Sequence, residues 1–302
     1  IYATKVIADG HYPLASDYRE IFLADNNTCK EIIWPLVQDG LRAQSSAGTN
    51  FYVKAFVNGP MDELYKTGVG SRGWGNVRAK VSLVDAFDAD DVMFDGNDTW
   101  GNNKKDKRAQ FMTALPNQVK DTWDVNMDMT STFTCGYGYI KWRNVTKEDE
   151  LSASGDAYTS IDFPLFRTAD AYLMAAEAIL RGASGTKSEA LGYVNEVRTR
   201  AYMSGKYAKN GVRSDVSGEI GANELDLDFL LLERQKELAS ELIRRTDLIR
   251  FGKYTKGNNW DWKNGVRLGE DVDDKYNLFP IPESELTNNP TLVQNDGYKV
   301  IK

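Results

Sequence analysis

Apolar residues at helical spacing stand out in the second half of the chain. In residues 166–182 an apolar side chain recurs every three or four positions, at Phe166, Ala169, Leu173, Ala176 and Leu180. This spacing predicts a helix that ends at Gly182. A second run at similar spacing consists of Ala190, Leu191, Val194, Val197 and Ala201. The short linker between the runs predicts that the two helices pack antiparallel as a hairpin.

Local signals set the boundaries of the helices around this hairpin. Thr186 and Glu189 form a capping box, whose two side chains can satisfy backbone amides at the start of the second helix. Leucines at helical spacing predict a third helix over residues 225–243, and a shorter helical piece is predicted over 247–252. Two prolines in residues 278–282 exclude a continuous helix there, so we expect an extended segment followed by a single turn.

The first half of the chain is predicted to hold short elements between long loops. Residues 1–8 have helical spacing up to Gly10 but no N-cap ahead of them, so the chain is expected to begin inside a helix. The apolar run 31–37 predicts a strand that Pro35 confines to an edge or an irregular position. The remaining predictions are mostly loop over 38–76, helix over 77–87, and strands over 108–112 and 137–145.

Composition and charge narrow the class of protein. The 302 residues are 41% hydrophobic and carry a formal charge of −7, and no apolar run approaches the roughly 20 residues that cross a bilayer. We therefore expect a globular chain without a membrane-spanning helix. The negative charge and the lack of a basic stripe argue against nucleic acid as a partner.

No motif predicts a cofactor or a metal. Residues 68–73 match GxGxxG, but no buried strand precedes them, so they are interpreted as a polar loop. The acidic stretch 88–98 fails the spacing of an EF-hand loop, which leaves calcium unsupported. The single histidine, His11, is expected to be structural or exposed. Cys29 and Cys135 are expected to be free thiols, with a disulfide between them as the alternative.

Three glutamates on the third predicted helix are the strongest candidates for catalysis. Glu233, Glu237 and Glu241 lie four residues apart, a spacing that can present a carboxylate pair to a glycosidic bond. Six arginines are expected to pair with them: Arg198 and Arg200 on the preceding helix, and Arg234, Arg244, Arg245 and Arg250. Ion-paired helix packing is therefore the preferred interpretation, and a glycoside hydrolase is the rival.

Aromatic residues in polar loops are the candidates for ligand binding. The chain has seven tryptophans and fifteen tyrosines, and the apolar faces of sugar rings stack on such side chains. Trp74 lies in a Gly-rich loop between Arg72 and Asn76, which would supply hydrogen bonds; anchoring of the loop in the core is the alternative role. Further candidates are Trp100 in a second polar loop, Tyr65, Trp123, Trp260 and Trp262.

Short sequence motifs over nearly the whole chain, taken in their order, resemble those of the SusD/RagB family. In the second half they include residues 166–177 (Phe-Arg-Thr-Ala-Asp-Ala-Tyr-Leu-Met-Ala-Ala-Glu), 197–201 (Val-Arg-Thr-Arg-Ala), 247–252 (Asp-Leu-Ile-Arg-Phe-Gly) and 278–282 (Leu-Phe-Pro-Ile-Pro). Weaker matches in the first half include 73–75 (Gly-Trp-Gly) and 84–87 (Val-Asp-Ala-Phe). One departure is Leu242, where family members usually have glycine, and it predicts a locally different helix end.

The resemblance implies a mainly α fold of tetratricopeptide-type helical pairs, with long loops and a few short strands. It divides the chain into a loop-rich part, 1–160, that carries the ligand-loop candidates, and a helical-pair part with an extended tail, 161–302. The family's N-terminal half, with its lipid anchor, is not matched. Without that half, the first helix and the hairpin are expected to expose apolar faces, so that the isolated chain is unstable or dimerises.

The function implied by the resemblance is non-catalytic. Such a protein sits on the cell surface at the outer membrane, binds an oligosaccharide, and delivers it to a SusC-like TonB-dependent transporter. Its membrane contact is through the lipid anchor alone. RagB-like relatives associated with peptide uptake leave the ligand class open, and a pure interaction scaffold is the third hypothesis.

Overall fold

The computed structural model describes residues 2–46, 48–57, 59–92, 104–112, 136–203 and 217–299. The chain divides into two compact units, residues 1–242 and 243–302. The first unit contains both parts that are set out above, the loop-rich segment and the helical pair. The fold is mainly α-helical with a few short strands, as expected.

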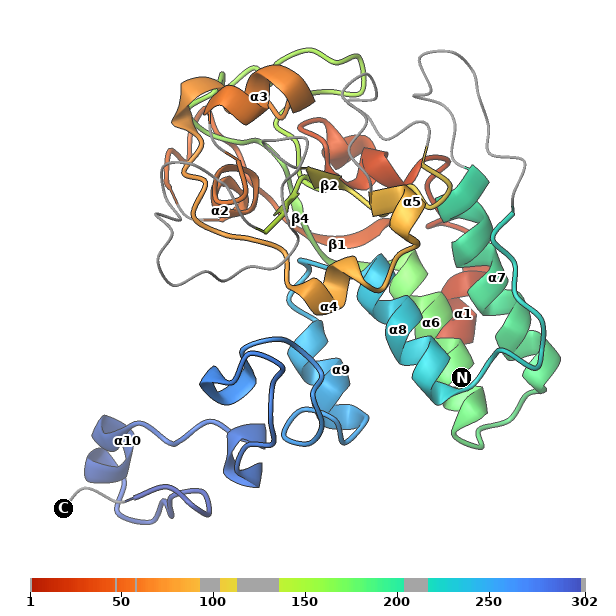
Figure 1. The fold of residues 1–302 in the computed structure, drawn as a ribbon, viewed down its shortest axis with the longest axis vertical. Coiled ribbons are helices and arrows are strands. Elements are labelled where there is room, and N and C mark those ends of the chain that lie inside the picture. The colour runs from red at the N-terminus through yellow and green to blue at the C-terminus, as the bar shows by residue number, and fades with distance from the viewer. Residues whose placement is uncertain are drawn as a thin grey trace. The chain divides into compact units, whose positions relative to one another are not determined.

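A layer of packed helices forms one side of the first unit (Figure 1). Its members are α1 (Tyr2–Asp9), α6 (Thr168–Leu180), α7 (Lys187–Met203) and α8 (Leu227–Glu237). The predicted hairpin is confirmed, since α6 and α7 pack together over a core whose members are at most 1% exposed: Ala169, Leu173, Ala176, Ala190, Val194, Val197, Leu225 and Leu230. The capping box is confirmed too, because Thr186 Oγ1 accepts from the Glu189 amide at 3.2 Å and Glu189 Oε2 from the Thr186 amide at 2.6 Å.

Short elements and loops make up the other side of the unit. Its helices are α2 (Thr49–Lys54), α3 (Gly59–Tyr65), α4 (Val81–Val84) and α5 (Ala89–Val92), with short 3-10 turns at Tyr18–Phe22, Asn26–Thr28 and Gly70–Arg72. The segment 38–76, predicted to be mostly loop, also contains the short helices α2 and α3, which the sequence pattern did not predict. These helices span two turns or fewer, too few for a periodic apolar pattern to show in the sequence. The helix predicted over 77–87 is confined to α4.

Two antiparallel strand pairs complete the first unit. In one, β1 (Ile32–Leu36) pairs with β4 (Phe163–Arg167), and in the other β2 (Phe111–Met112) pairs with β3 (Gly138–Tyr139). The strand expected around Pro35 is confirmed. The sequence pattern missed β4, because Phe166 fits the helical spacing of α6 but lies in this strand opposite Trp34. The β1–β4 pair joins the loop-rich part to the helical part.

The third predicted helix is shorter than expected. It ends at Glu237, and the following turn contains two residues in the left-handed backbone region, Ser240 (φ 61°) and Leu242 (φ 63°). The locally different helix end predicted from Leu242 is therefore present. Leu242 is 75% exposed, so it is not on a buried helix face.

The second unit contains few regular elements. They are α9 (Arg244–Arg250), α10 (Glu283–Asn288) and 3-10 turns at Lys263–Gly265 and Asp274–Asn277. Hydrogen bonds between loops stabilise this unit, such as Thr255 Oγ1 to Asp274 Oδ1 at 2.6 Å and the Tyr298 hydroxyl to the Leu278 carbonyl at 2.8 Å. The single turn predicted after residue 282 is present as α10.

Candidate functional site

The loop that carries Trp74 is fixed to the end of α2 by backbone hydrogen bonds. The Trp74 amide donates to the Lys54 carbonyl at 2.8 Å, and the Val77 amide donates to the Ala55 carbonyl at 2.9 Å. Trp74 is nevertheless 37% exposed. A partly exposed ring on a fixed backbone suits a stacking surface, because the loop loses little conformational entropy when a ligand binds.

Trp74 is the outer end of a row of aromatic rings that starts in the core. From inside outwards, this aromatic row consists of Trp142, Tyr52, Phe51 and Trp74. Trp142 is 1% exposed, whereas Phe51 is 44% exposed, and the Phe51 and Trp74 rings lie 6.2 Å apart at 59°. Burial raises the pKa of the Tyr52 hydroxyl. The row therefore links the exposed loop to the core of the unit.

Polar groups lie close to Trp74 along the chain. The Arg72 Nε donates to Asp156 Oδ1 at 3.0 Å, and both side chains are substantially exposed, at 57% and 40%. This pair holds the guanidinium through Nε, and its terminal nitrogens are hydrogen-bond donors that a polar ligand can use. Asn76 is exposed. The candidate site also contains Asp156, Phe51 and Tyr52, which the sequence analysis did not predict. The adjacent aromatic residues at 51 and 52 were the one signal in the sequence that could have indicated them.

The remaining sequence candidates have different positions. Tyr65 is 5% exposed within the core, so its ring is not available to a ligand in this structure. Trp100 and Trp123 lie outside the described residues. Trp260 packs on Tyr254 at 5.6 Å in the second unit, where Trp262 also lies. Of the candidates, the structure brings Arg72, Trp74 and Asn76 onto one exposed loop.

The Gly-rich loop before Trp74 does not have the arrangement of a phosphate site. The carboxylate of Asp62 accepts from the amides of Val69 at 3.2 Å and Gly70 at 2.9 Å. In a phosphate loop such amides face the anion, whereas here the protein's own carboxylate occupies them. The interpretation of residues 68–73 as a structural loop is consistent with this geometry.

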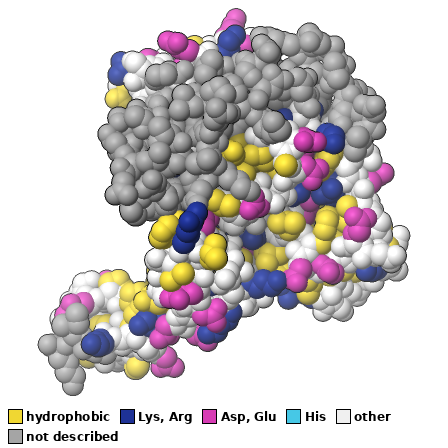
Figure 2. Space-filling view, in the orientation of Figure 1, with side chains coloured by type: hydrophobic (Ala, Val, Ile, Leu, Met, Phe, Trp, Pro, Cys, Tyr) yellow, Lys and Arg dark blue, Asp and Glu magenta, His cyan; other side chains and the backbone are white. Residues whose placement is uncertain are grey.

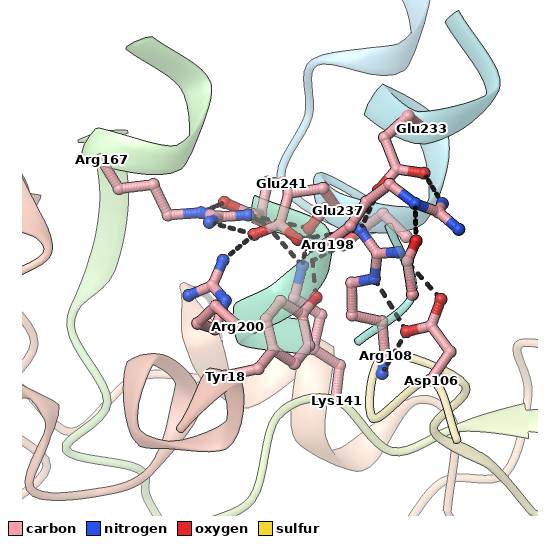
Figure 3. Close-up of polar contacts among 12 residues, drawn as sticks. Tyr18, Asp106, Arg108, Lys141, Arg167, Arg198, Arg200, Glu233, Glu237 and Glu241 are labelled. Carbon is pink, nitrogen blue, oxygen red and sulfur yellow. Dashed lines mark hydrogen bonds and ion pairs between the residues drawn. The ribbon is translucent and has the colours of Figure 1, made fainter. Parts of the chain in front are cut away.

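The three glutamates considered for catalysis belong to a buried ion network (Figure 3). Five cations and five carboxylates, each at most 8% exposed, form it: Arg108, Lys141, Arg167, Arg198, Arg200, Glu31, Asp106, Glu233, Glu237 and Glu241. Their formal charges cancel. Buried charges are tolerated when they are paired and hydrogen-bonded, and here each carboxylate contacts at least one cation.

The network joins the helices to the loop-rich part of the unit. Glu233 accepts from Arg198 of α7 at 2.6 Å and from Arg108 at 2.6 Å. Arg167, at the end of β4, contacts Glu31 at 2.9 Å and Glu237 at 2.6 Å. Of the predicted arginines, Arg198 and Arg200 pair with the helix glutamates, whereas Arg234 pairs with Asp170 and Arg250 with Asp247. The contributions of Arg108, Lys141, Arg167 and Glu31 were missed, since those residues are remote in sequence.

The electrostatics of the network hold Glu237 ionised. Burial alone would raise the pKa of Glu237, but Arg200, Arg167 and Arg108 outweigh it and hold that pKa well below its usual range. Burial lowers the pKa of Lys141 to about 8, against the opposing effect of Glu241. A glycosidase acid needs a raised pKa in an open cleft. Glu237 has a lowered pKa instead, and Glu233 and Glu241 are buried in ion pairs, at 1% and 5% exposed.

The other candidate chemistry is either structural or outside the described residues. Cys29 has a free thiol whose pKa is raised to about 11 by burial, while Cys135 lies outside the described residues. His11 is exposed and lies 3.0 Å from Asp9. Of the acidic stretch 88–98, residues 93–98 are not described; in the described part of the chain, no cluster of His, Cys, Asp and Glu has the arrangement of a metal site.

The surface and the helices give two further findings. On the face drawn in Figure 2, positive and negative side chains are interspersed with hydrophobic ones over the described residues. The described residues on that face show no continuous basic stripe of the kind that binds nucleic acid. None of the helices within the described ranges is both long enough and apolar enough to cross a bilayer.

Comparisons with known proteins give one consistent result. The "Starch-binding protein SusD" of Bacteroides thetaiotaomicron is 32% identical over 328 residues, covering 99% of this chain and 55% of that protein. The "SusD-like protein P25" of Formosa agariphila is 26% identical, covering 97% of this chain and 53% of that protein. The chain thus spans about half the length of these curated relatives.

Solved structures with the same fold include a glycan complex. Surface glycan-binding protein A from Bacteroides thetaiotaomicron, solved with laminarihexaose, matches with a TM-score of 0.62 at 20% identity, over 97% of this chain and 58% of that one. The model of the SusD family matches residues 30–298. The chain has the sequence motifs and the fold of this family, and the family model matches most of the chain. The chain therefore belongs to the SusD family.

Proposed function

We propose that this chain is part of a non-catalytic surface protein that binds an oligosaccharide through the loop of Trp74. The observation that carries the proposal is the exposed Trp74 ring, held by the α2 backbone and backed by Phe51. A sugar ring presents C–H groups to such a face, while its hydroxyls need polar partners at the edge. Arg72 and Asn76 supply those partners.

The relatives support the ligand class and the cellular setting of the proposal. Two of them are named for binding starch or a surface glycan. In this setting the whole protein sits at the outer membrane, exposed at the cell surface and held by a lipid anchor, and passes its ligand to a SusC-like TonB-dependent transporter. The ion-paired state of Glu233, Glu237 and Glu241 favours binding over hydrolysis.

Calorimetric titration of the intact protein tests this function. The panel contains starch oligosaccharides, laminarihexaose and unrelated peptides, and the variants are Trp74→Ala and Trp34→Ala. Trp34 is the matched control, because it is also exposed, at 62%, and also packs on a phenylalanine, Phe166. We expect Trp74→Ala to weaken glycan binding by at least about tenfold, or about 1.4 kcal/mol, and Trp34→Ala to leave it unchanged.

Three results would contradict the proposal. Equal loss of affinity in both variants would mean that Trp74 is not the stacking residue. Saturable binding of peptides alone would move the protein to the peptide-binding class. Release of shortened sugars from the oligosaccharides would show hydrolysis and exclude a purely binding role.

A further inference from the structure

An apolar groove of about 450 Å³ lies beside the aromatic row. It is lined mainly by hydrocarbon, from Leu36, Phe51, Tyr52, Phe163, Leu165 and Leu242. β1 and β4 supply the strand residues, with Leu36 directly opposite Phe163. The groove is thus built on the same strand pair that joins the two parts of the unit.

The chemistry of the lining excludes a sugar ring as the preferred occupant of the groove itself. Thr49 also lines it, but its hydroxyl is 2.8 Å from both the Thr159 hydroxyl and the Ile161 carbonyl. The other side chains with polar groups in the lining are Gln38, Ser46 and Tyr52, the last through its single hydroxyl. A sugar that enters would lose hydrogen bonds to water with few replacements, which costs about 1–3 kcal/mol for each unmatched group. An apolar group meets no such cost.

Leu242 shows that the rim of the groove is held in a defined shape. Its φ of 63° is a left-handed conformation, which costs a residue with a Cβ roughly 1–2 kcal/mol. The side chain recovers little by burial, since it is 75% exposed. The adjacent Glu241 fixes this turn, because its carboxylate pairs with both Arg167 and Lys141 in the ion network. A strained backbone kept in place by its surroundings points to a functional role.

Phe51 connects this groove to the site at Trp74. Its ring contacts that of Trp74 and also lines the groove. A saccharide stacked on Trp74 would therefore place a neighbouring substituent over Phe51, at the entrance of the groove. The continuity between the two surfaces identifies the occupant as part of the same ligand.

We propose that the groove is an apolar subsite that takes an alkyl, acyl or aryl substituent carried by the saccharide bound at Trp74. The inference rests on the proposed glycan binding and narrows its ligand class to substituted glycans. Each methylene transferred from water to the groove is expected to tighten binding roughly fourfold. Leu242, Leu36 and Leu165 are the residues that set this preference.

Alkyl glucosides of increasing chain length test the subsite. Binding of methyl and hexyl β-D-glucopyranoside to the intact protein is measured by ligand-observed NMR, below the micelle concentration of the hexyl compound, with hexan-1-ol as a third probe. We expect the hexyl glucoside to bind at least tenfold more tightly than the methyl glucoside. Leu242→Gly is expected to reduce this ratio at least threefold without weakening the methyl glucoside, because glycine accepts the positive φ. Leu36→Gln, at a residue that is 57% exposed, is a second variant with the same expected effect.

The outcomes separate this inference from the proposed function. Equal affinity for the two glucosides, no binding of the hexyl glucoside, or an unchanged ratio in both variants would overturn the subsite. Glycan binding that depends on Trp74 would survive any of these results. Hexan-1-ol binding as tightly as hexyl glucoside would also overturn it, since the saccharide would then contribute nothing.

Discussion

Arg167 and Glu241 face each other in a two-point ion pair. Arg167 Nε donates to Glu241 Oε2 at 2.7 Å, and Arg167 Nη2 donates to Oε1 at 2.8 Å. Both side chains are buried, and the pair connects the end of β4 to the turn after α8. Bidentate pairing of this kind fixes orientation as well as distance, so the strand and the turn are held in one relative position.

Removal of one member of this pair is expected to be strongly destabilising. Arg167→Met removes a buried cation that pairs with Glu241, Glu237 and Glu31. A buried carboxylate that loses its partner typically lowers the free energy of unfolding by about 3–5 kcal/mol. Urea denaturation of the two proteins measures the difference. The control is Arg42→Met, which breaks the exposed pair of Arg42 with Asp39 at 3.1 Å and should change stability by less than about 1 kcal/mol. Similar effects of both variants would contradict a structural role for the network.

Acid should unfold the protein through the same network. The pKa of Glu237 is held below its usual range in the folded state. The stability that Glu237 contributes is therefore fully present above the pKa of an unfolded glutamate, about 4.3, and is lost as the pH falls from there towards the folded pKa. The loss is at most about 1.4 kcal/mol per pH unit for this one group. We expect a shallower loss of stability below pH ~4.3 in Glu237→Gln than in the wild type.

Urea denaturation at a series of pH values checks this expectation. Glu148→Gln serves as the control, because Glu148 is exposed and should leave the pH dependence unchanged. An identical slope in the wild type and in Glu237→Gln would show that Glu237 does not contribute to acid sensitivity.

Leu242→Gly is expected to leave stability unchanged or to raise it. Relief of the positive φ returns roughly 1–2 kcal/mol, against about 0.5–1 kcal/mol for the greater freedom of glycine in the unfolded chain. Leu232→Gly is the comparison, because Leu232 is also partly exposed, at 38%, but lies inside α8. It should lose at least about 1 kcal/mol. Thermal unfolding of both variants decides the matter, and an equal loss would mean that Leu242 is not strained.

The capping box at the start of α7 predicts a smaller effect. Thr186→Ala removes the hydroxyl that accepts from the Glu189 amide, which should cost about 1 kcal/mol. Ser188→Ala, at an exposed neighbouring position, should change stability by less than about 0.5 kcal/mol. Chemical denaturation resolves the difference; if Ser188→Ala were the more damaging change, the cap would not function as drawn.

Local signals in the sequence account for the helical hairpin. The spacing of apolar residues in α6 and α7 and the Thr186–Glu189 box depend on residues at most four positions apart, so they can be read without knowledge of the tertiary structure. The end of α8 shows the limit of such signals. Leu238 and Leu242 continue the helical spacing, but Glu241 is drawn into pairs with Arg167 and Lys141, and the backbone turns instead.

The candidate site was predictable only in part. Trp74, Arg72 and Asn76 share one short loop, so the sequence could bring them together. Asp156 reaches Arg72 through the tertiary fold, and Phe51 reaches Trp74 only because α2 lies against that loop. Tyr65 looked like a loop aromatic, yet it ends the unpredicted helix α3 and is buried.

The ion network also bears on how the first unit folds. Its pairs join residues that are far apart in the chain, with separations of 125 residues for Arg108 and Glu233, 136 for Glu31 and Arg167, and 169 for Glu31 and Arg200. Contacts of such long range close large loops and form slowly. Until they form, each part of the unit holds charges whose partners lie on the other part. We therefore expect the loop-rich part and the helical part to join late in folding, since neither part can neutralise its buried charges without the other.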